Sequence, residues 1–459
     1  MRSRATLAWA AYLIPAAVLA LYAVVQWLVA VANRVPVLYG EGAVANAARL
    51  ARDGVAYLDP DPSRFVAANY PPLFFHLASI GDPFISGRIA SIAATLSVAA
   101  IVFVAARPAG WLAAGALSGG WLALAPVAIW GPALKPDLVA LALTTVAVVT
   151  LDRRRELAPI AGFALVFAAL AKPTALLPGA ALAAWLAQSD RPTLVRGGFG
   201  AAVAVVAAAV TVYLDSVPDV WRHVVTWNAL SWSYEGAIQI AVIGVVVIGA
   251  PLGVAAFTRG VGGARAAYLA GAIAIVIAGG REGATINYLL DLTVATALSL
   301  AAVAPRLRAG ALFPILALAQ LVLATAIIDP LRVVPGRVPL TGAWGDPSRG
   351  ASIAPEVATG EPLLVEDSGL LVARGATPTV DDLFLWSRLV DRGTIDAAPI
   401  LTQVANARFR AVVSEADLEH LDAAPGFERQ RWTAALARAV VERYRLDRHE
   451  GPLWIYVPR

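Results

Sequence analysis

Long apolar stretches repeat through roughly the first 330 residues of this chain and restrict the folds open to it. Most of them come close to the length of about 20 residues at which a helix crosses a bilayer. Of all residues, 59% are hydrophobic and 15% are charged, whereas soluble domains average about 45–50% apolar and about 25% charged. The sequence therefore predicts a polytopic α-helical membrane protein with about 11 transmembrane helices, over residues 7–32, 86–106, 110–130, 137–151, 157–171, 173–188, 198–214, 237–257, 266–280, 286–303 and 310–329.

The basic residues predict the orientation of these helices. The first apolar run exceeds the core of about 7–15 residues of a cleavable signal, so we expect a retained helix that starts in the cytoplasm. Cytoplasmic loops are richer in lysine and arginine than outer loops. They would carry Arg2, Arg4, Arg107, Arg153, Arg154, Arg155, Arg191, Arg196, Arg259, Arg265, Arg306 and Arg308, against Lys135, Lys172, Arg222 and Arg281 in the short outer connections.

Composition divides the chain into two parts and a linker. We expect a transmembrane domain over 1–332 with a long first outer loop at 33–85, a Pro- and Gly-rich linker at 333–350, and a small α/β domain at 351–459. An odd number of helices puts the last domain outside the plasma membrane. Its pattern predicts strands at 363–365, 409–413 and 453–457, with helices at 381–392, 397–407 and 428–444.

Several function classes leave no trace in the sequence. Cysteine is absent, which removes disulfides and thiol nucleophiles. The arginines are spread along the chain, so we expect no nucleic-acid partner. No Walker motif, dinucleotide fingerprint or Gly-x-Ser-x-Gly elbow occurs, which argues against an ATP-driven pump and a serine hydrolase. No cofactor is indicated, and a divalent metal is left open although no typical ligand spacing supports one.

An acid stands where the first predicted helix enters water, in Tyr39-Gly40-Glu41-Gly42. Residues 43–52 then read as an amphipathic helix that lies on the membrane surface. Partial desolvation there would suit Glu41 to act as a general base, and the flanking glycines would let a substrate come close to the backbone. The alternative is that Glu41 only stabilises a helix N-terminus.

Four cations are predicted at the outer ends of helices, namely Arg88, Lys135, Lys172 and Arg281. Arginine and lysine at such positions suit a phosphate group, and together they could neutralise a lipid phosphate as it leaves a substrate. For each residue alone, ordinary extension of the side chain to the membrane surface is the alternative explanation.

The outer segments also hold candidates for substrate binding. Asp137 follows Lys135 and begins a helix, so capping competes with a binding role. A single histidine among apolar neighbours, such as His76, is more often structural than a ligand. The complete set of substrate-binding candidates is Tyr39, Tyr70, His76, Asp137, Asn287 and Tyr288.

The order of these motifs resembles the C-type glycosyltransferase (GT-C) superfamily, in particular its branch of lipid A aminoarabinose transferases and protein O-mannosyltransferases. The likeness rests on Tyr39-Gly40-Glu41-Gly42, Tyr70-Pro71-Pro72-Leu73, Lys135-Pro136-Asp137 and Ala171-Lys172-Pro173-Thr174, and on the soluble C-terminal domain. Many members pair Asp with Glu in the first loop, whereas Gly40 precedes Glu41 here.

The resemblance implies an integral-membrane glycosyltransferase. A polyprenyl-phosphate-linked sugar would be the donor, Glu41 the catalytic base, and Lys172 and Arg281 the ligands of the leaving phosphate, together with Lys135 and Arg88. Attack by an acceptor hydroxyl of a lipid, glycan or protein would invert the anomeric centre. Two alternatives stay open: a transporter or flippase of lipid-linked sugars, and a non-catalytic subunit of an envelope assembly.

Overall fold

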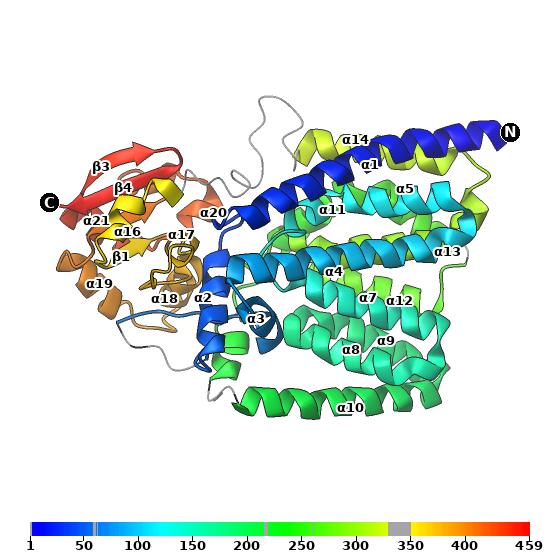
Figure 1. Cartoon of the computed structure of the whole chain (residues 1–459), viewed down its shortest axis with the longest axis horizontal. Helices are drawn as coiled ribbons and strands as arrows, with labels where there is room; N and C mark the ends of the chain where they lie inside the picture. The colour runs from blue at the N-terminus through cyan, green and yellow to red at the C-terminus, as the bar shows by residue number, and fades with distance from the viewer. Residues whose placement is uncertain (1, 58–60, 62, 215–218, 259, 329–349) are drawn as a thin grey trace.

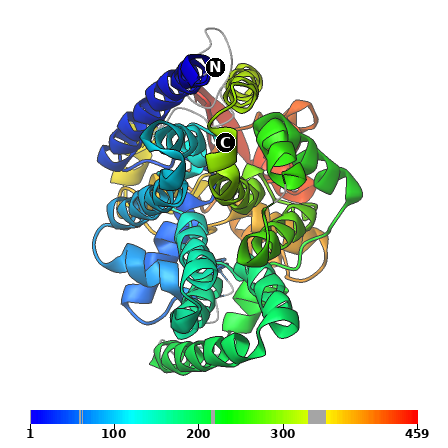
Figure 2. The ribbon, with the colours of Figure 1, turned by 90° about the vertical axis from the view of Figure 1, so that its right-hand side faces the viewer.

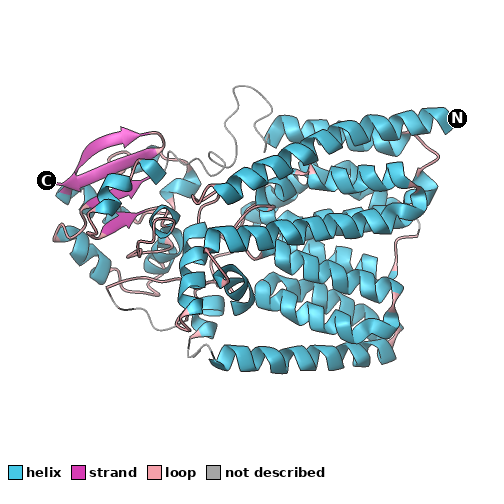
Figure 3. Ribbon diagram, in the orientation of Figure 1, coloured by secondary structure: helices cyan, strands magenta, loops and turns pink. Residues whose placement is uncertain are grey.

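A computed structural model of the chain describes residues 2–459 except 58–60, 62, 215–218, 259 and 329–349. The described residues form a bundle of long helices and a small α/β part, which lies at the end of the bundle away from the N-terminus (Figure 1). Strands occur in that small part, and the rest of the described chain is helical or looped (Figure 3). The predicted fold class, a mostly helical chain with a small C-terminal sheet, is confirmed.

The predicted apolar stretches fall on helices, although the stretch at 110–130, predicted as one helix, forms the two helices α5 and α6. By length and composition, five described helices could cross a membrane and two shorter ones are strongly apolar, so the number of crossings stays a prediction. The helices of the bundle are α1 (Arg2–Ala32), α4 (Pro83–Ala106), α5 (Trp111–Leu122), α6 (Ala125–Trp130), α7 (Asp137–Arg153), α8 (Ala158–Ala171), α9 (Leu176–Ser189), α10 (Arg191–Leu214), α11 (Tyr234–Phe257), α12 (Gly263–Ala278), α13 (Leu290–Leu307) and α14 (Leu312–Ile328).

The helix α13 forms the centre of the bundle. Most of its residues are buried, among them the polar Thr293, Thr296 and Ser299. It packs against α4, α5, α11 and α12. The helices α1 and α10, in contrast, lie at opposite edges when the bundle is viewed along its length (Figure 2). Their exposed apolar side chains fit contact with lipid.

The first outer loop folds into α2 (Glu41–Arg52) and α3 (Pro72–Ser79). The predicted helix at 43–52 therefore exists, but it does not lie on a surface. Most residues of α2 are buried, because α3 packs on one side and α17 (Gly369–Val372) on another. A side chain at Gly42 would collide with the backbone of Gly369, since its Cβ would lie 2.1 Å from that amide nitrogen.

The C-terminal part contains a four-stranded sheet in the order β1-β2-β4-β3. Strand β1 (Leu363–Val365) runs parallel to β2 (Ala411–Ser414), and β4 (Leu453–Pro458) is antiparallel to both β2 and β3 (Tyr444–Glu450). The described helices of this part are α16 (Ala354–Ala358), α17, α18 (Leu383–Asp391), α19 (Ala398–Ala405), α20 (Gly426–Arg429) and α21 (Ala434–Arg443).

Strand β3 was not expected from the sequence. Four of its seven residues are charged and most are exposed, so the alternation that reveals a half-buried strand is missing. The strand lies at the edge of the sheet, where charged side chains prevent pairing with other chains. Of the predicted linker, all residues except Gly350 lie outside the described part of the chain.

The C-terminal part is attached to the first outer loop by backbone and side-chain contacts. Phe65 forms a parallel bridge with Val380, with Phe65 N donating to Thr379 O at 2.8 Å. The amide of Asn46 on α2 donates to the Asp381 carboxylate at 3.0 Å. The loop and the α/β part thus form one packed unit at this end of the bundle.

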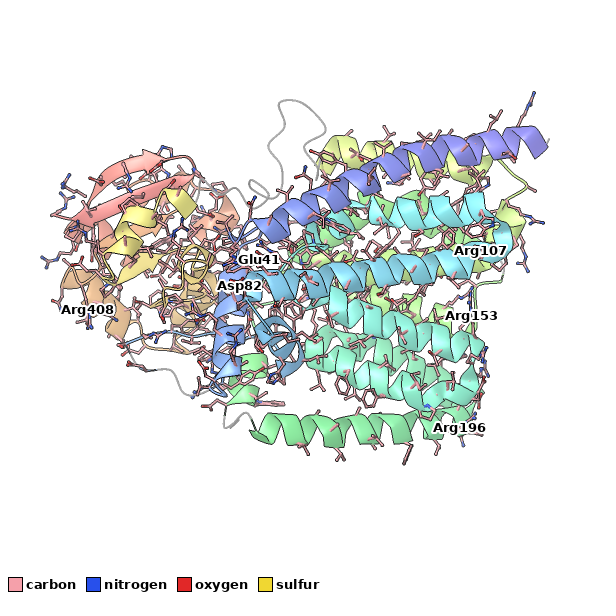
Figure 4. The ribbon with its side chains drawn as sticks, viewed as in Figure 1. Glu41, Asp82, Arg107, Arg153, Arg196 and Arg408 are labelled. Atoms are coloured by element: carbon pink, nitrogen blue, oxygen red, sulfur yellow. The ribbon has the colours of Figure 1, made fainter. Side chains whose placement is uncertain are left out.

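The two ends of the bundle differ in charge. Arg107, Arg153 and Arg196, all predicted to be cytoplasmic, lie at the end opposite Glu41 (Figure 4). This separation agrees with the pattern that predicted the orientation, although which end faces the cytoplasm stays a prediction.

Candidate active site

A cavity of about 930 Å³ lies where the bundle meets the C-terminal part. Both parts contribute walls, and both polar and apolar groups face the space. Its size is typical of small-molecule sites. Of the residues predicted from the sequence, the cavity brings together Tyr39, Tyr70, Lys135, Asp137, Arg281 and Asn287.

Two cations line the side of the cavity formed by the bundle. Lys135 follows α6, and its side-chain ammonium forms no hydrogen bond or ion pair with any described residue. Burial lowers the pKa of Lys135, and the carboxylates of Asp382 and Glu41 oppose that effect. Arg281 donates from Nη1 to Asn228 O at 2.6 Å and keeps a buried Nε that no described residue satisfies. Both side chains are therefore available to an anion.

Asp137 joins the cavity to the polar interior of the bundle. Its Oδ1 accepts from Lys172 Nζ at 2.5 Å and from Asn287 Nδ2 at 2.7 Å. Its Oδ2 is buried and has no partner among the described residues. Lys172 also lies over the ring of Tyr288 at 5.0 Å and does not line the large cavity. The predicted phosphate ligand Lys172 is thus a partner of Asp137.

Glu41 lies outside the cavity, because its side chain is wholly buried below the loop that lines it. Oε2 accepts from Arg88 Nη2 at 2.7 Å and from Val37 N at 2.9 Å. Oε1 accepts from Leu134 N at 2.7 Å. These bonds tie α2, α4 and the segment before α7 together. Both oxygens are occupied, so the carboxylate predicted to act as a base has no contact with the cavity in this structure.

Arg88 belongs to the same buried contact between α2, α4 and the segment before α7. Its side chain is wholly buried and donates to the carbonyls of Ala30, Asn33 and Val35 at the end of α1. A cation stabilises the carbonyl end of a helix. The sequence analysis predicted that Arg88 binds a phosphate. In the structure, Arg88 does not line the cavity, and its contacts are with the protein itself.

At both flanking glycines, an added side chain would meet neighbouring protein atoms, although Gly40 itself lines the cavity. Gly40 adopts φ 77°, and Lys135 Nζ lies 2.8 Å from the place of its missing Cβ. At Gly42, the missing side chain leaves room for the backbone of Gly369 in α17. Two further candidates, His76 on α3 and the buried Tyr288, also lie outside the lining of the cavity.

The C-terminal part supplies residues that the sequence analysis missed. Arg431 pairs with Glu366 at 2.8 Å and with Glu415 at 2.5 Å, and its guanidinium lies 4.0 Å from the centre of the Tyr39 ring. Acids that directly follow the predicted strands could have indicated this end of the sheet, because ligand-binding sites often lie at the ends of parallel strands. The residues of this part with side chains at the cavity include Asp367, Asp382, Glu415, Glu428 and Arg431.

The two sides of the cavity differ in charge. The bundle contributes Lys135 and Arg281 together with Asp137 and Glu282, whereas the C-terminal part contributes four carboxylates and Arg431. Such an arrangement can hold an anion on one side while acids on the other accept protons or hydrogen bonds. Within the described residues, no three His, Cys, Asp or Glu side chains gather where they could hold a metal ion.

A buried acid between the first outer loop and the C-terminal part predicts that the stability of the protein depends on pH. Burial raises the pKa of Asp381 to about 7, although bonds from Asn46 and Ala67 N oppose the rise. The folded state then holds the proton more tightly than the unfolded state, so stability is lost as pH rises toward the folded pKa. We expect the melting temperature to fall between about pH 5 and about pH 7, and to fall less in Asp381→Asn. Equal slopes in thermal melts of the two proteins would contradict this prediction.

Comparisons with known proteins identify the fold. No family model matches the chain, and no curated protein matches it. The fold is nevertheless that of two solved structures of ArnT, in agreement with the resemblance noted in the sequence motifs. ArnT from Cupriavidus metallidurans bound to undecaprenyl phosphate aligns over 96% of this chain and 97% of its own, at 15% identity and a TM-score of 0.60. Its apo state aligns over the same shares at 14% identity and a TM-score of 0.61.

Proposed function

We propose that this protein is an integral-membrane glycosyltransferase that moves a sugar from a polyprenyl-phosphate-linked donor to an acceptor hydroxyl on the extracytoplasmic side. The observation that carries the proposal is the pair of cations, Lys135 and Arg281, in a large cavity of a GT-C fold. The similar ArnT structure binds undecaprenyl phosphate. A lipid phosphate of that kind would complement the two cations.

In the proposed reaction, Lys135 and Arg281 hold the phosphate that links lipid and sugar. The acceptor oxygen attacks the anomeric carbon, the bond from that carbon to the phosphate oxygen breaks, and the phosphate leaves with the electron pair. One displacement inverts the anomeric centre. Fixed positive charge at the leaving oxygen favours this step because the charge of the phosphate grows as the bond breaks.

Glu41 and Arg88 then act as positioning residues. Their pair fixes the loop from Val35 to Gly40 and, through Leu134 N, the segment that carries Lys135. Lys172 has a parallel role, since it holds Asp137 at the wall of the cavity. This assignment keeps the predicted motifs within the site, with roles that follow from their contacts.

The proposed transferase and the two alternatives, a transporter and an assembly subunit, predict different results. If the protein is a transferase, a strain that lacks the gene should accumulate a lipid-linked sugar, which mass spectrometry of lipid extracts would detect. Protein in lipid nanodiscs should consume that lipid and release polyprenyl phosphate when an envelope extract supplies the acceptor. Translocation in vesicles without cleavage of the sugar bond would support a transporter, and neither activity would support an assembly subunit.

Replacement of Arg281 tests the phosphate site directly. We expect Arg281→Gln to weaken the binding of undecaprenyl phosphate about tenfold, because a charge-assisted hydrogen bond is worth roughly 1.5–3 kcal/mol. Thermal stabilisation at increasing undecaprenyl phosphate measures the affinity. Arg222→Gln is the matched control, since Arg222 pairs with Asp219 and does not line the cavity. Unchanged affinity in Arg281→Gln would remove this residue from the site.

A further inference from the structure

None of the described residues of the first outer loop brings a carboxylate to the cavity. Gly40 has no side chain, and the space beside it is occupied by Lys135 Nζ. Glu41 is buried and both of its oxygens accept hydrogen bonds. Transfer to a hydroxyl needs a group that removes its proton, so another acid at the cavity must supply the base.

Three of the six acids that line the cavity are already engaged by cations. Glu282 pairs with Arg388 at 3.3 Å, and Glu415 pairs with Arg431 at 2.5 Å. Asp137 is held by Lys172. Each pair occupies a carboxylate oxygen with a cation, so that oxygen is not free to take a proton from a substrate.

Asp382 has different surroundings. It caps the N-terminus of α18, with Oδ1 accepting from Leu385 N at 3.0 Å and from the Tyr39 hydroxyl at 3.3 Å. Among the described residues, no hydrogen bond or ion pair engages Oδ2. Of the charges acting on Lys135, Asp382 has the strongest effect, ahead of Glu41 and Asp137. The side chains of Lys135 and Asp382 therefore face the same cavity, one from the bundle and the other from the C-terminal part.

The environment of Asp382 also suits proton transfer. Burial raises the pKa of Asp382, and Lys135 and the Leu385 amide oppose that rise without cancelling it. A carboxylate with a raised pKa is a stronger base than an exposed one. The Tyr39 hydroxyl, itself held by Phe384 N at 2.8 Å, fixes the carboxylate from one side and leaves the other free.

We propose that Asp382, carried by the C-terminal part, is the general base of the transfer, an inference that rests on the proposed function. Oδ2 takes the proton of the acceptor hydroxyl as the oxygen bonds to the anomeric carbon. The bond to the lipid phosphate breaks, and its electron pair leaves with the phosphate beside Lys135 and Arg281. The proton then passes from Asp382 to water. The acceptor therefore enters on the side of the C-terminal part.

The test compares full-length proteins in nanodiscs, supplied with lipid extract from a strain that lacks the gene and with envelope extract as acceptor. Released polyprenyl phosphate is measured by mass spectrometry. We expect Asp382→Asn to lower the initial rate by about 100-fold or more, because a positioned base contributes about 10²–10⁴-fold. The variant should still bind undecaprenyl phosphate as wild type does. Asparagine keeps an Oδ1 that can cap α18.

Two further proteins complete the test. Glu361→Gln removes an exposed carboxylate of the C-terminal part that does not line the cavity, and it should stay within about threefold of the wild-type rate. Asp382→Ser also keeps a cap for α18 and should lose the same activity as Asp382→Asn. An active wild type with an equally active Asp382→Asn would overturn this inference alone and favour Asp137. A wild type that releases no polyprenyl phosphate would overturn the proposed function and this inference with it.

Discussion

Replacing Lys135 by methionine is expected to reduce sugar transfer by about 100- to 1000-fold in a protein that folds normally. Lys135 has no ion-pair partner among the described residues, so its removal breaks no direct ion pair, although it takes away a charge that opposes the raised pKa of Asp382. Its ammonium group would meet the phosphate where negative charge grows during the reaction. The loss should therefore appear in turnover and in the affinity for undecaprenyl phosphate.

The second lysine of the chain, Lys172, provides the contrast. Lys172→Met would leave Asp137 buried without its cation, which typically costs about 3–5 kcal/mol of stability. We therefore expect a lower melting temperature for Lys172→Met and an unchanged one for Lys135→Met. Lys135→Arg keeps the charge but crowds Gly40, so an intermediate rate is expected. A rate for Lys135→Met within about threefold of wild type would exclude Lys135 from the phosphate site.

Replacing Glu41 by alanine is expected to destabilise the protein by about 3–5 kcal/mol, because Arg88 would remain buried without its partner. The hydrogen bonds from Val37 N and Leu134 N would be lost as well. Chemical or thermal unfolding measures the change. Arg88→Met should have a similar effect, since it leaves the Glu41 carboxylate buried and uncompensated.

The double variant separates a structural role of Glu41 from a catalytic one. If the two residues act through each other, Glu41→Leu combined with Arg88→Met should be more stable than the sum of the single changes predicts. Glu41→Gln keeps much of the hydrogen bonding and should retain transfer in proportion to folded protein. A folded Glu41→Gln protein without turnover would instead restore Glu41 as the base.

The membrane part of the fold could be predicted because its signal is local. A run of apolar residues reports a buried or lipid-facing helix wherever its neighbours lie, so the stretch at 286–303 matched α13. The helix at 43–52 and the strands at 363–365 and 453–457 were also visible from local pattern. The strand β3 was missed because its charged residues carry no such pattern.

The site depended on contacts that no local pattern contains. Glu41 was correctly picked as unusual, but the same burial of a charge marks a catalytic group and a structural ion pair alike. The difference lies in Arg88 and in the amide of Leu134, which only the folded chain brings to it. Asp382 was missed for the same reason, since Tyr39 and Lys135 reach it through docking of the C-terminal part.

The contact between Tyr39 and Asp382 also has a consequence for biogenesis. These residues are separated by 343 positions in the chain. At a synthesis rate of about 5–20 residues per second, roughly 20 to 70 s pass between the translation of the first and of the second. Throughout that interval α2 lacks the backbone of α17 that later covers Gly42. A chain released before α17 is made would keep the helices of the bundle but leave this face of α2 uncovered and lack the acid proposed as the base.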